Sequence, residues 1–154
     1  GMSITAERDE VIDFTQDYFP PSPSVYMGMS GSDVDLEGGV IAAQTATIQA
    51  GYVAESGATL VEFATAEETI SAVQNGEADA VLADGDYLAS IIAESGGEFA
   101  NVGEVSIGGG VGMGIRESDG DLKATMDKAI SSMKEDGSLN ALIKKWFGND
   151  ANTF

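Results

Sequence analysis

The chain has 154 residues, which suits one domain or two small lobes and allows a sizeable hydrophobic core. Its composition is 43% hydrophobic and 21% charged, as in a folded protein, and 26 acidic residues against 7 basic ones give a net charge of −19. This charge argues strongly against nucleic acid or an anionic membrane as a partner, since both bind basic patches. Without Cys or His, the chain has no disulfide, no thiolate or imidazole metal site and no His-based triad.

Arg8 is the only cation in the first 115 residues, which hold nineteen Asp and Glu; the other six cations follow. A single guanidinium in so acidic a stretch has two interpretations. It either pairs with Glu7, Asp9 or Glu10, with little effect on stability if the pair is exposed, or it is kept for an anionic ligand.

Residues 17–38 hold all three prolines and read as a connection between two packed bodies, although 24–29 has the pattern of an extended segment. Three strand-and-helix pairs follow. Strands are predicted at 40–44, 59–63 and 79–84, and helices at 47–56, 65–75 and 86–95. The spacing of Thr65 and Glu68 indicates a capping box, and Gly76 ends the same helix. This alternation predicts βαβ units around a parallel sheet.

The pattern changes after Gly97. Residues 101–107 and 111–116 are predicted to be extended on either side of a glycine run, which fits no nucleotide-binding motif. A helix at 121–136 ends at Gly137, and Ser138 is expected to cap a second helix. Apolar residues on one face of these helices predict a core; they are Leu122, Met126, Ala129, Ile130, Met133, Leu139, Leu142, Ile143 and Trp146.

Two strand-to-helix junctions carry polar groups at the edge where open α/β sheets bind ligands. Thr47 follows the strand at 40–44, and the free N–H groups of a helix start favour an anion. Asp84 ends the strand at 79–84 and favours a cation. Taken alone, Thr47 is better explained as an ordinary helix N-cap, and Asp84 at a strand-to-helix turn has the same alternative explanation. Taken together, the two junctions fit a zwitterion.

Four segments in order resemble the polar amino-acid-binding periplasmic proteins of bacterial ABC importers, which are family 3 of the type II solute-binding proteins. They are MSITAERDEVIDFT (2–15), VIAAQTATIQAGYV (40–53), GEADAVLAD (76–84) and the stretch from GVGMGIR to KKWFG (110–148). The resemblance implies that the ligand's α-carboxylate is bound by Ser3, Arg8, Thr47, the Ile48 amide and Gln49, and its ammonium by Asp84. The chain departs from the family at Ala46, where a glycine is usual.

The resemblance also implies an α/β fold of the periplasmic binding protein type II class, with one complete βαβ lobe and a partial second lobe. Residues 27–107 are expected to form lobe two, and residues 1–26 and 108–154 a remnant of lobe one that lacks its N-terminal part, with hinges near 25–27 and 106–109. We expect this remnant to leave apolar helix stripes uncovered and to favour a homodimer.

The implied function is that of the extracytoplasmic amino-acid-binding component of an ABC importer, or a truncated relative of one. This component would be periplasmic and non-enzymatic, and it would use no cofactor or metal. Its partner would be a membrane permease. The chain itself is expected to hold neither a signal peptide nor a membrane span. One alternative is a lyase of the cyclohexadienyl dehydratase kind, for which Glu62, Glu67 and Asp86 are the available acids. The other is a truncated, non-binding, dimeric interaction protein.

Overall fold

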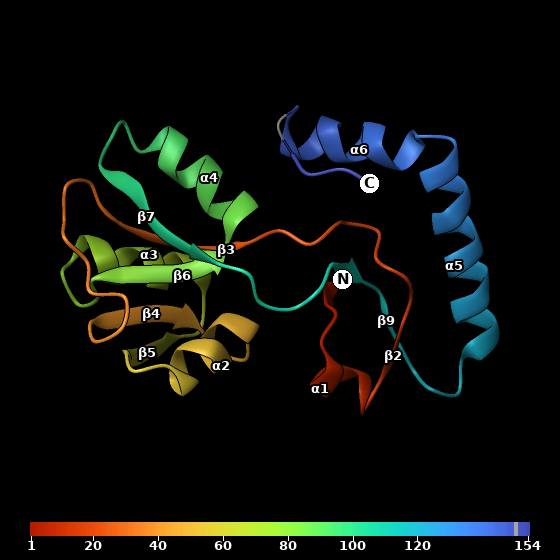
Figure 1. The fold of residues 1–154 in the computed structure, drawn as a ribbon, viewed down its shortest axis with the longest axis horizontal. Helices are drawn as coiled ribbons and strands as arrows, with labels where there is room; N and C mark the ends of the chain where they lie inside the picture. Colours follow the sequence, from red (N-terminus) through yellow and green to blue (C-terminus); the bar gives the residue numbers. More distant parts are fainter. Residues whose placement is uncertain (150) are drawn as a thin grey trace. The chain divides into compact units, whose positions relative to one another are not determined.

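The computed structural model describes residues 1–149 and 151–154. Two compact units make up the chain (Figure 1): unit 1 comprises Gly1–Ser22 and Gly108–Phe154, and unit 2 comprises Pro23–Ile107. Unit 1 is therefore built from both ends of the chain, and unit 2 is inserted into it.

Unit 2 is built on a five-stranded sheet with the order β5-β4-β6-β3-β7. The strands are β3 (Ser24–Met29), β4 (Val40–Gln44), β5 (Thr59–Phe63), β6 (Ala80–Asp84) and β7 (Phe99–Val105). β4 runs parallel to β5 and β6, which confirms the predicted βαβ units, but β3 runs antiparallel to both β6 and β7. The sheet is therefore mixed and not purely parallel.

Residues 17–38 were expected to connect two packed bodies, but β3 lies within them. Ser24–Met29 is buried along most of its length between β6 and β7, and is therefore a central part of the sheet. The first boundary between units accordingly lies after Ser22 and not after residue 26.

Three helices cover the two faces of this sheet: α2 (Ile48–Glu55), α3 (Ala66–Gln74) and α4 (Gly85–Glu94). On one face, Met27 and Val81 pack with Val73 of α3 and Leu88 of α4. A second cluster on alternate strand residues includes Tyr26, Ile41, Leu82 and Val53 of α2. Burial on both faces explains why the strands read as nearly continuous apolar runs.

The helix signals in unit 2 are confirmed where they are strongest. Thr65 and Glu68 form the predicted capping box, with bonds of 3.0 and 3.2 Å between each side chain and the other residue's backbone N–H. Gly76 follows the end of α3 with φ of +73°, a conformation that glycine adopts without steric cost.

The described residues of unit 1 form two short antiparallel strand pairs and three helices. The elements are β1 (Met2–Ser3), α1 (Ala6–Asp9), β2 (Asp13–Phe14), β8 (Val111–Gly112), β9 (Gly114–Ile115), α5 (Gly120–Glu135) and α6 (Ser138–Phe147), with β1 paired to β8 and β2 to β9. Its core joins Phe19 to Ile130, Leu139 and Ile143 of the last two helices. Gly137, in a left-handed conformation, takes the N-cap position of α6 that was predicted for Ser138.

The apolar stripes of α5 and α6 are only partly covered. Ile130, Leu139 and Ile143 are buried, whereas the side chains of Leu122, Leu142, Trp146 and Phe147 are exposed, Trp146 to 71%. None of the helices in the described residues has the apolar length that a membrane crossing requires.

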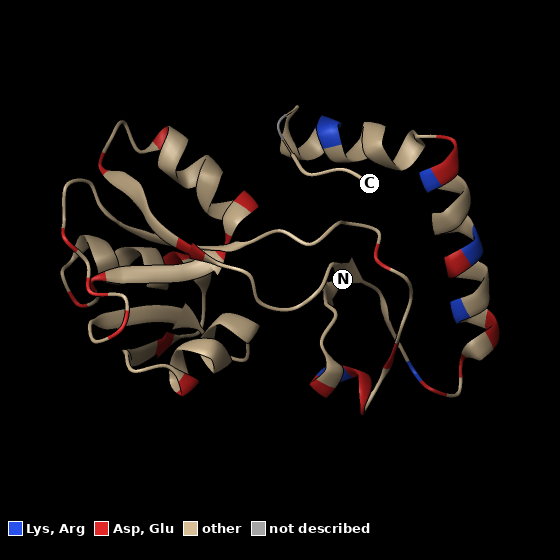
Figure 2. Ribbon diagram, viewed as in Figure 1, with Lys and Arg blue, Asp and Glu red and all other residues tan. Residues whose placement is uncertain are grey.

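Charge is divided unequally between the units (Figure 2). Unit 2 carries fourteen Asp or Glu residues and no Lys or Arg, and all seven cations of the chain belong to unit 1. The negative potential of unit 2 is therefore not offset by any positive side chain of its own.

Candidate functional site

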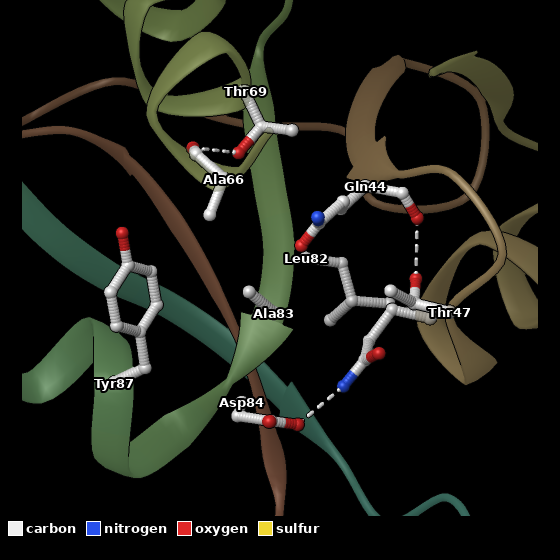
Figure 3. A pocket seen from close by; sticks show the side chains of 9 residues that line it. Gln44, Thr47, Ala66, Thr69, Leu82, Ala83, Asp84 and Tyr87 are labelled. Atoms are coloured by element: carbon white, nitrogen blue, oxygen red, sulfur yellow. Dashed lines mark hydrogen bonds between the residues drawn. The ribbon is translucent and has the colours of Figure 1, made fainter. Parts of the chain in front are cut away.

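A pocket of about 330 Å³ lies in unit 2 where strands β4 and β6 end and helices α2, α3 and α4 begin (Figure 3). Its lining residues are Gln44, Thr47, Gln49, Ala66, Thr69, Leu82, Ala83, Asp84 and Tyr87. Of the predicted unit 2 site residues, the pocket brings together Thr47, Gln49 and Asp84. Ile48 does not line it.

Thr47 is the N-cap of α2, which confirms its interpretation as a helix N-cap. Its hydroxyl accepts a 3.2 Å bond from the Ala50 N–H and donates a 2.7 Å bond to the Gln44 carbonyl. The N–H groups of Ile48 and Gln49, in the first turn, have no acceptor within a helix. They can bind an anion, which the helix dipole also favours.

The turn that leads into α2 is strained at one residue. Ala46 has φ of +62°, the only positive φ of a non-glycine residue in the described chain. A left-handed alanine costs roughly 1–2 kcal/mol. The conformation explains why glycine would be the easier residue at this position.

Asp84 stands at the N-cap position of α4, but its side chain makes no capping hydrogen bond. The interpretation of Asp84 as an ordinary cap is therefore wrong. Its Oδ1 instead accepts a 2.7 Å bond from Nε2 of Gln49, and the carboxylate is exposed and lines the pocket (Figure 3). A carboxylate held in this way suits a cationic group.

Gln49 is only 5% exposed, and Nε2 also donates a 3.0 Å bond to the hydroxyl of Ser24 on β3. Ser24 is itself buried and pairs in register with Asp84 across β3 and β6. A polar network thus links three strand and helix ends behind the pocket.

Sequence reasoning missed Gln44, Thr69 and Tyr87 as lining residues. Each lies at the end of a strand or in the first turn of a helix, so the junction rule that found Thr47 and Asp84 also applied to them. Partial burial, and then the negative charge of Glu67, raise the pKa of the Tyr87 phenol above its ordinary value. Its hydroxyl therefore stays neutral near pH 7.

Ser3 and Arg8 belong to unit 1. Thr5 caps the single-turn helix α1 by accepting a 3.2 Å bond from the Arg8 N–H, and Nη1 of Arg8 donates a 2.9 Å bond to the carbonyl oxygen of Ser3. The structure therefore brings this predicted pair together within its own unit.

Arg8 makes no ion pair within 4.0 Å among residues 1–149 and 151–154, and its pairing with Glu7, Asp9 or Glu10 is contradicted. The ion pairs that do form in this part of the chain are Arg116–Asp119, Lys123–Asp127 and Lys134–Asp17. The half-buried guanidinium keeps donor groups beyond the one that binds Ser3. Nor do the described residues include three or more acidic groups placed to hold a metal ion.

Comparison with known proteins gives consistent results. Residues 1–149 match the family described as bacterial extracellular solute-binding proteins, family 3. A crystal structure of a periplasmic His/Glu/Gln/Arg/opine family-binding protein from Silicibacter pomeroyi in complex with lysine is 69% identical, with a TM-score of 0.95, over 100% of this chain and 70% of that one.

Two curated relatives are more distant. The L-arginine-binding protein of Pseudomonas aeruginosa is 28% identical over 97% of this chain and 64% of its own length. The lysine/arginine/ornithine-binding periplasmic protein of Escherichia coli is 27% identical over 96% of this chain and 62% of its own length. The chain thus spans less than two thirds of either relative.

The fold agrees with the family match. The mixed α/β architecture is that of the type II periplasmic binding proteins, as the superposition on the Silicibacter structure demonstrates. Because the family match extends from residue 1 to residue 149, the chain belongs to the bacterial extracellular solute-binding proteins of family 3.

Proposed function

We propose that this chain is the amino-acid-binding part of the periplasmic component of an ABC importer. The ligand is a free L-amino acid, and the partner that receives it is a membrane permease. In unit 2, Asp84 binds the α-ammonium, and the start of α2 at Thr47 and Ile48 binds the α-carboxylate. Ser3 and Arg8 of unit 1 are retained as carboxylate-binding residues.

The observation that carries this proposal is the pocket of unit 2. Its lining includes the exposed carboxylate of Asp84 together with Thr47 and Gln49 at the start of α2, so that an acceptor for a cation lies close to a helix start, which favours an anion. A free amino acid carries both charges on neighbouring atoms. The guanidinium of Arg8, which forms no ion pair within the described residues, supports the same ligand, because an α-carboxylate leaving water needs a cation with planar, two-pronged donors.

A cationic amino acid is the ligand class that fits best. Unit 2 contains fourteen acidic residues and no basic one, which attracts cations and repels an acidic side chain. The Silicibacter relative was crystallised with lysine, and the two curated relatives are named for arginine or for lysine, arginine and ornithine.

The binding function is favoured over a lyase by the chemistry of the pocket. Among the described residues that line it, Asp84 is the only carboxylate, and it is held by Gln49. The acids considered for a lyase, Glu62, Glu67 and Asp86, do not line the pocket. The relatives named above are also binding proteins by name.

A homodimer of the chain in isolation is a further part of the proposal. The side chains of Leu122, Leu142, Trp146 and Phe147 are exposed on the helices of unit 1, and exposed apolar surface of this kind favours association.

A thermal-shift screen against the twenty amino acids tests the function. We expect L-lysine or L-arginine at a hundred times its dissociation constant to stabilise the chain by about 2.7 kcal/mol, or roughly 8 °C in melting temperature. Asp84→Ala should abolish the shift. A flat response to all twenty amino acids would refute the proposal.

A further inference from the structure

We propose that Gln49 and Ser24 are positioning residues that fix the carboxylate of Asp84 toward the pocket, and that Gln49 does not donate to the ligand carboxylate. This inference rests on the proposed function for its ligand-binding part. It replaces the carboxylate contact that family resemblance implies for Gln49.

The donor count of the Gln49 side chain carries the argument. A primary amide has two N–H donors on one nitrogen. In this chain Nε2 donates to Oδ1 of Asp84 at 2.7 Å and to the hydroxyl of Ser24 at 3.0 Å. Both donors are therefore used within the protein, and none is left for an anionic ligand.

The orientation of the amide is fixed by charge. If the amide were rotated by half a turn, its oxygen would face the Asp84 carboxylate, and two acceptors would repel each other at hydrogen-bond distance. With Nε2 toward Asp84, the remaining polar atom of Gln49 is Oε1, which accepts hydrogen bonds. Gln49 thus belongs with Asp84 on the ammonium side of the ligand.

Burial makes this arrangement rigid. Gln49 and Ser24 are 5% and 3% exposed, so water cannot readily replace either bond. Ser24 pairs with Asp84 in the β3–β6 register, and the next residue, Gly85, donates a 3.1 Å backbone bond to the Pro23 carbonyl. The backbone under Asp84 and its side chain are therefore both tied to the start of β3.

Binding of two ligands distinguishes a Gln49 that positions Asp84 from a Gln49 that contacts the ligand carboxylate directly. L-Lysine carries both α-groups, whereas 6-aminohexanoic acid keeps the carboxylate and the terminal ammonium but lacks the α-ammonium. With Gln49→Met, we expect the dissociation constant for L-lysine to rise about tenfold or more. The constant for 6-aminohexanoic acid should stay within about twofold. Equal losses for both ligands would overturn the proposal, because they would mean that Gln49 serves the carboxylate or only the fold.

Matched variants control for loss of an amide. Gln74→Met removes a glutamine of unit 2 that lies outside the pocket and donates at 3.4 Å to Glu98, so it should change neither constant. Ser24→Ala removes one hydroxyl only. Ser24→Ala should weaken binding of L-lysine selectively, by less than Gln49→Met does. If Gln49→Met does not fold, Ser24→Ala is used for the test in its place.

A ligand-free measurement distinguishes failure of this inference from failure of the proposed function. Hydrogen exchange of the Gln49 side-chain amide, followed by NMR in the full chain, should be slow and should accelerate at least tenfold in Asp84→Ala. The Gln74 amide should not change. If wild-type chain binds no L-lysine but this acceleration occurs, the function fails and the positioning contact stands. Unchanged exchange of Gln49 would overturn the inference.

Discussion

Gln49 and Asp84 are separated by thirty-five positions in the chain, and a 2.7 Å hydrogen bond joins Nε2 of the first to Oδ1 of the second. The bond connects the first turn of α2 to the end of β6, and it frees Asp84 from capping α4. A carboxylate that does not cap its own helix is available for a ligand. This contact is the feature of the unit 2 pocket that most favours binding of a cationic group.

Replacing Arg8 tests the proposed carboxylate contact. Arg8→Ala should weaken binding of L-lysine by about 3–5 kcal/mol, the cost of leaving a buried charge without its partner, which is a hundredfold or more in dissociation constant. Isothermal titration calorimetry gives the constant directly. Arg116→Ala removes an arginine whose pair with Asp119 is exposed, and it should leave the constant unchanged. An Arg8→Ala chain with wild-type affinity would contradict the assignment.

Relief of backbone strain should stabilise unit 2. Ala46→Gly is expected to raise the free energy of unfolding by about 1 kcal/mol, because glycine adopts φ of +62° without steric cost. Gly76→Ala introduces the same strain at φ of +73° with no neighbouring atom within 4 Å, and it should lower the free energy by a similar amount. Urea unfolding followed by circular dichroism measures both; shifts in the same direction would contradict the account.

The contact between Gln16 and α5 should make unit 1 sensitive to acid. Burial alone raises the pKa of Asp127, but bonds from the Gln16 N–H at 2.7 Å and from Lys123 at 3.0 Å outweigh it and lower the pKa below its ordinary value. A lowered pKa gives stability that is present above the unfolded value of about 3.9. That stability is lost as the pH falls through the folded value.

Asp127→Asn isolates this effect. The variant should be less stable than wild type by about 1 kcal/mol at pH 7. The difference should begin to shrink as the pH falls below about 4 and should disappear once the pH is below the lowered pKa of Asp127 in the folded chain. Trp146, the only tryptophan, lies in unit 1 and reports its unfolding by fluorescence. Glu135→Gln, an exposed residue of the same helix, is the control. A difference that is constant with pH would mean that the charge of Asp127 does not matter.

Association of the chain should depend on the exposed face of α6. We expect light scattering of the wild-type chain to give twice the mass of one chain, and Trp146→Ser to give a monomer, since Trp146 is 71% exposed. Tyr87→Ser, which removes an exposed aromatic residue of unit 2, should leave the dimer intact. A monomeric wild-type chain at all concentrations would rule out the dimer.

The sequence by itself determined the elements whose signals are local. The strands at 40–44 and 59–63, the capping box of Thr65 and Glu68, and the helices from residue 120 onward follow from apolar periodicity and capping chemistry, which act over a few residues. The junction rule likewise located Thr47 and Asp84, because helix starts and strand ends are visible in the chain order.

Only the tertiary structure decided what these residues contact. Ser24–Met29 is a central antiparallel strand because β6 and β7 bury it, and the three prolines that precede it in the sequence gave no sign of those neighbours. Gln49 binds both Ser24 and Asp84, which come from distant segments, and the guanidinium of Arg8 binds the carbonyl of Ser3 and forms no ion pair with the acids beside it. Such contacts depend on the register of strands and the packing of helices, which residues near in sequence do not fix.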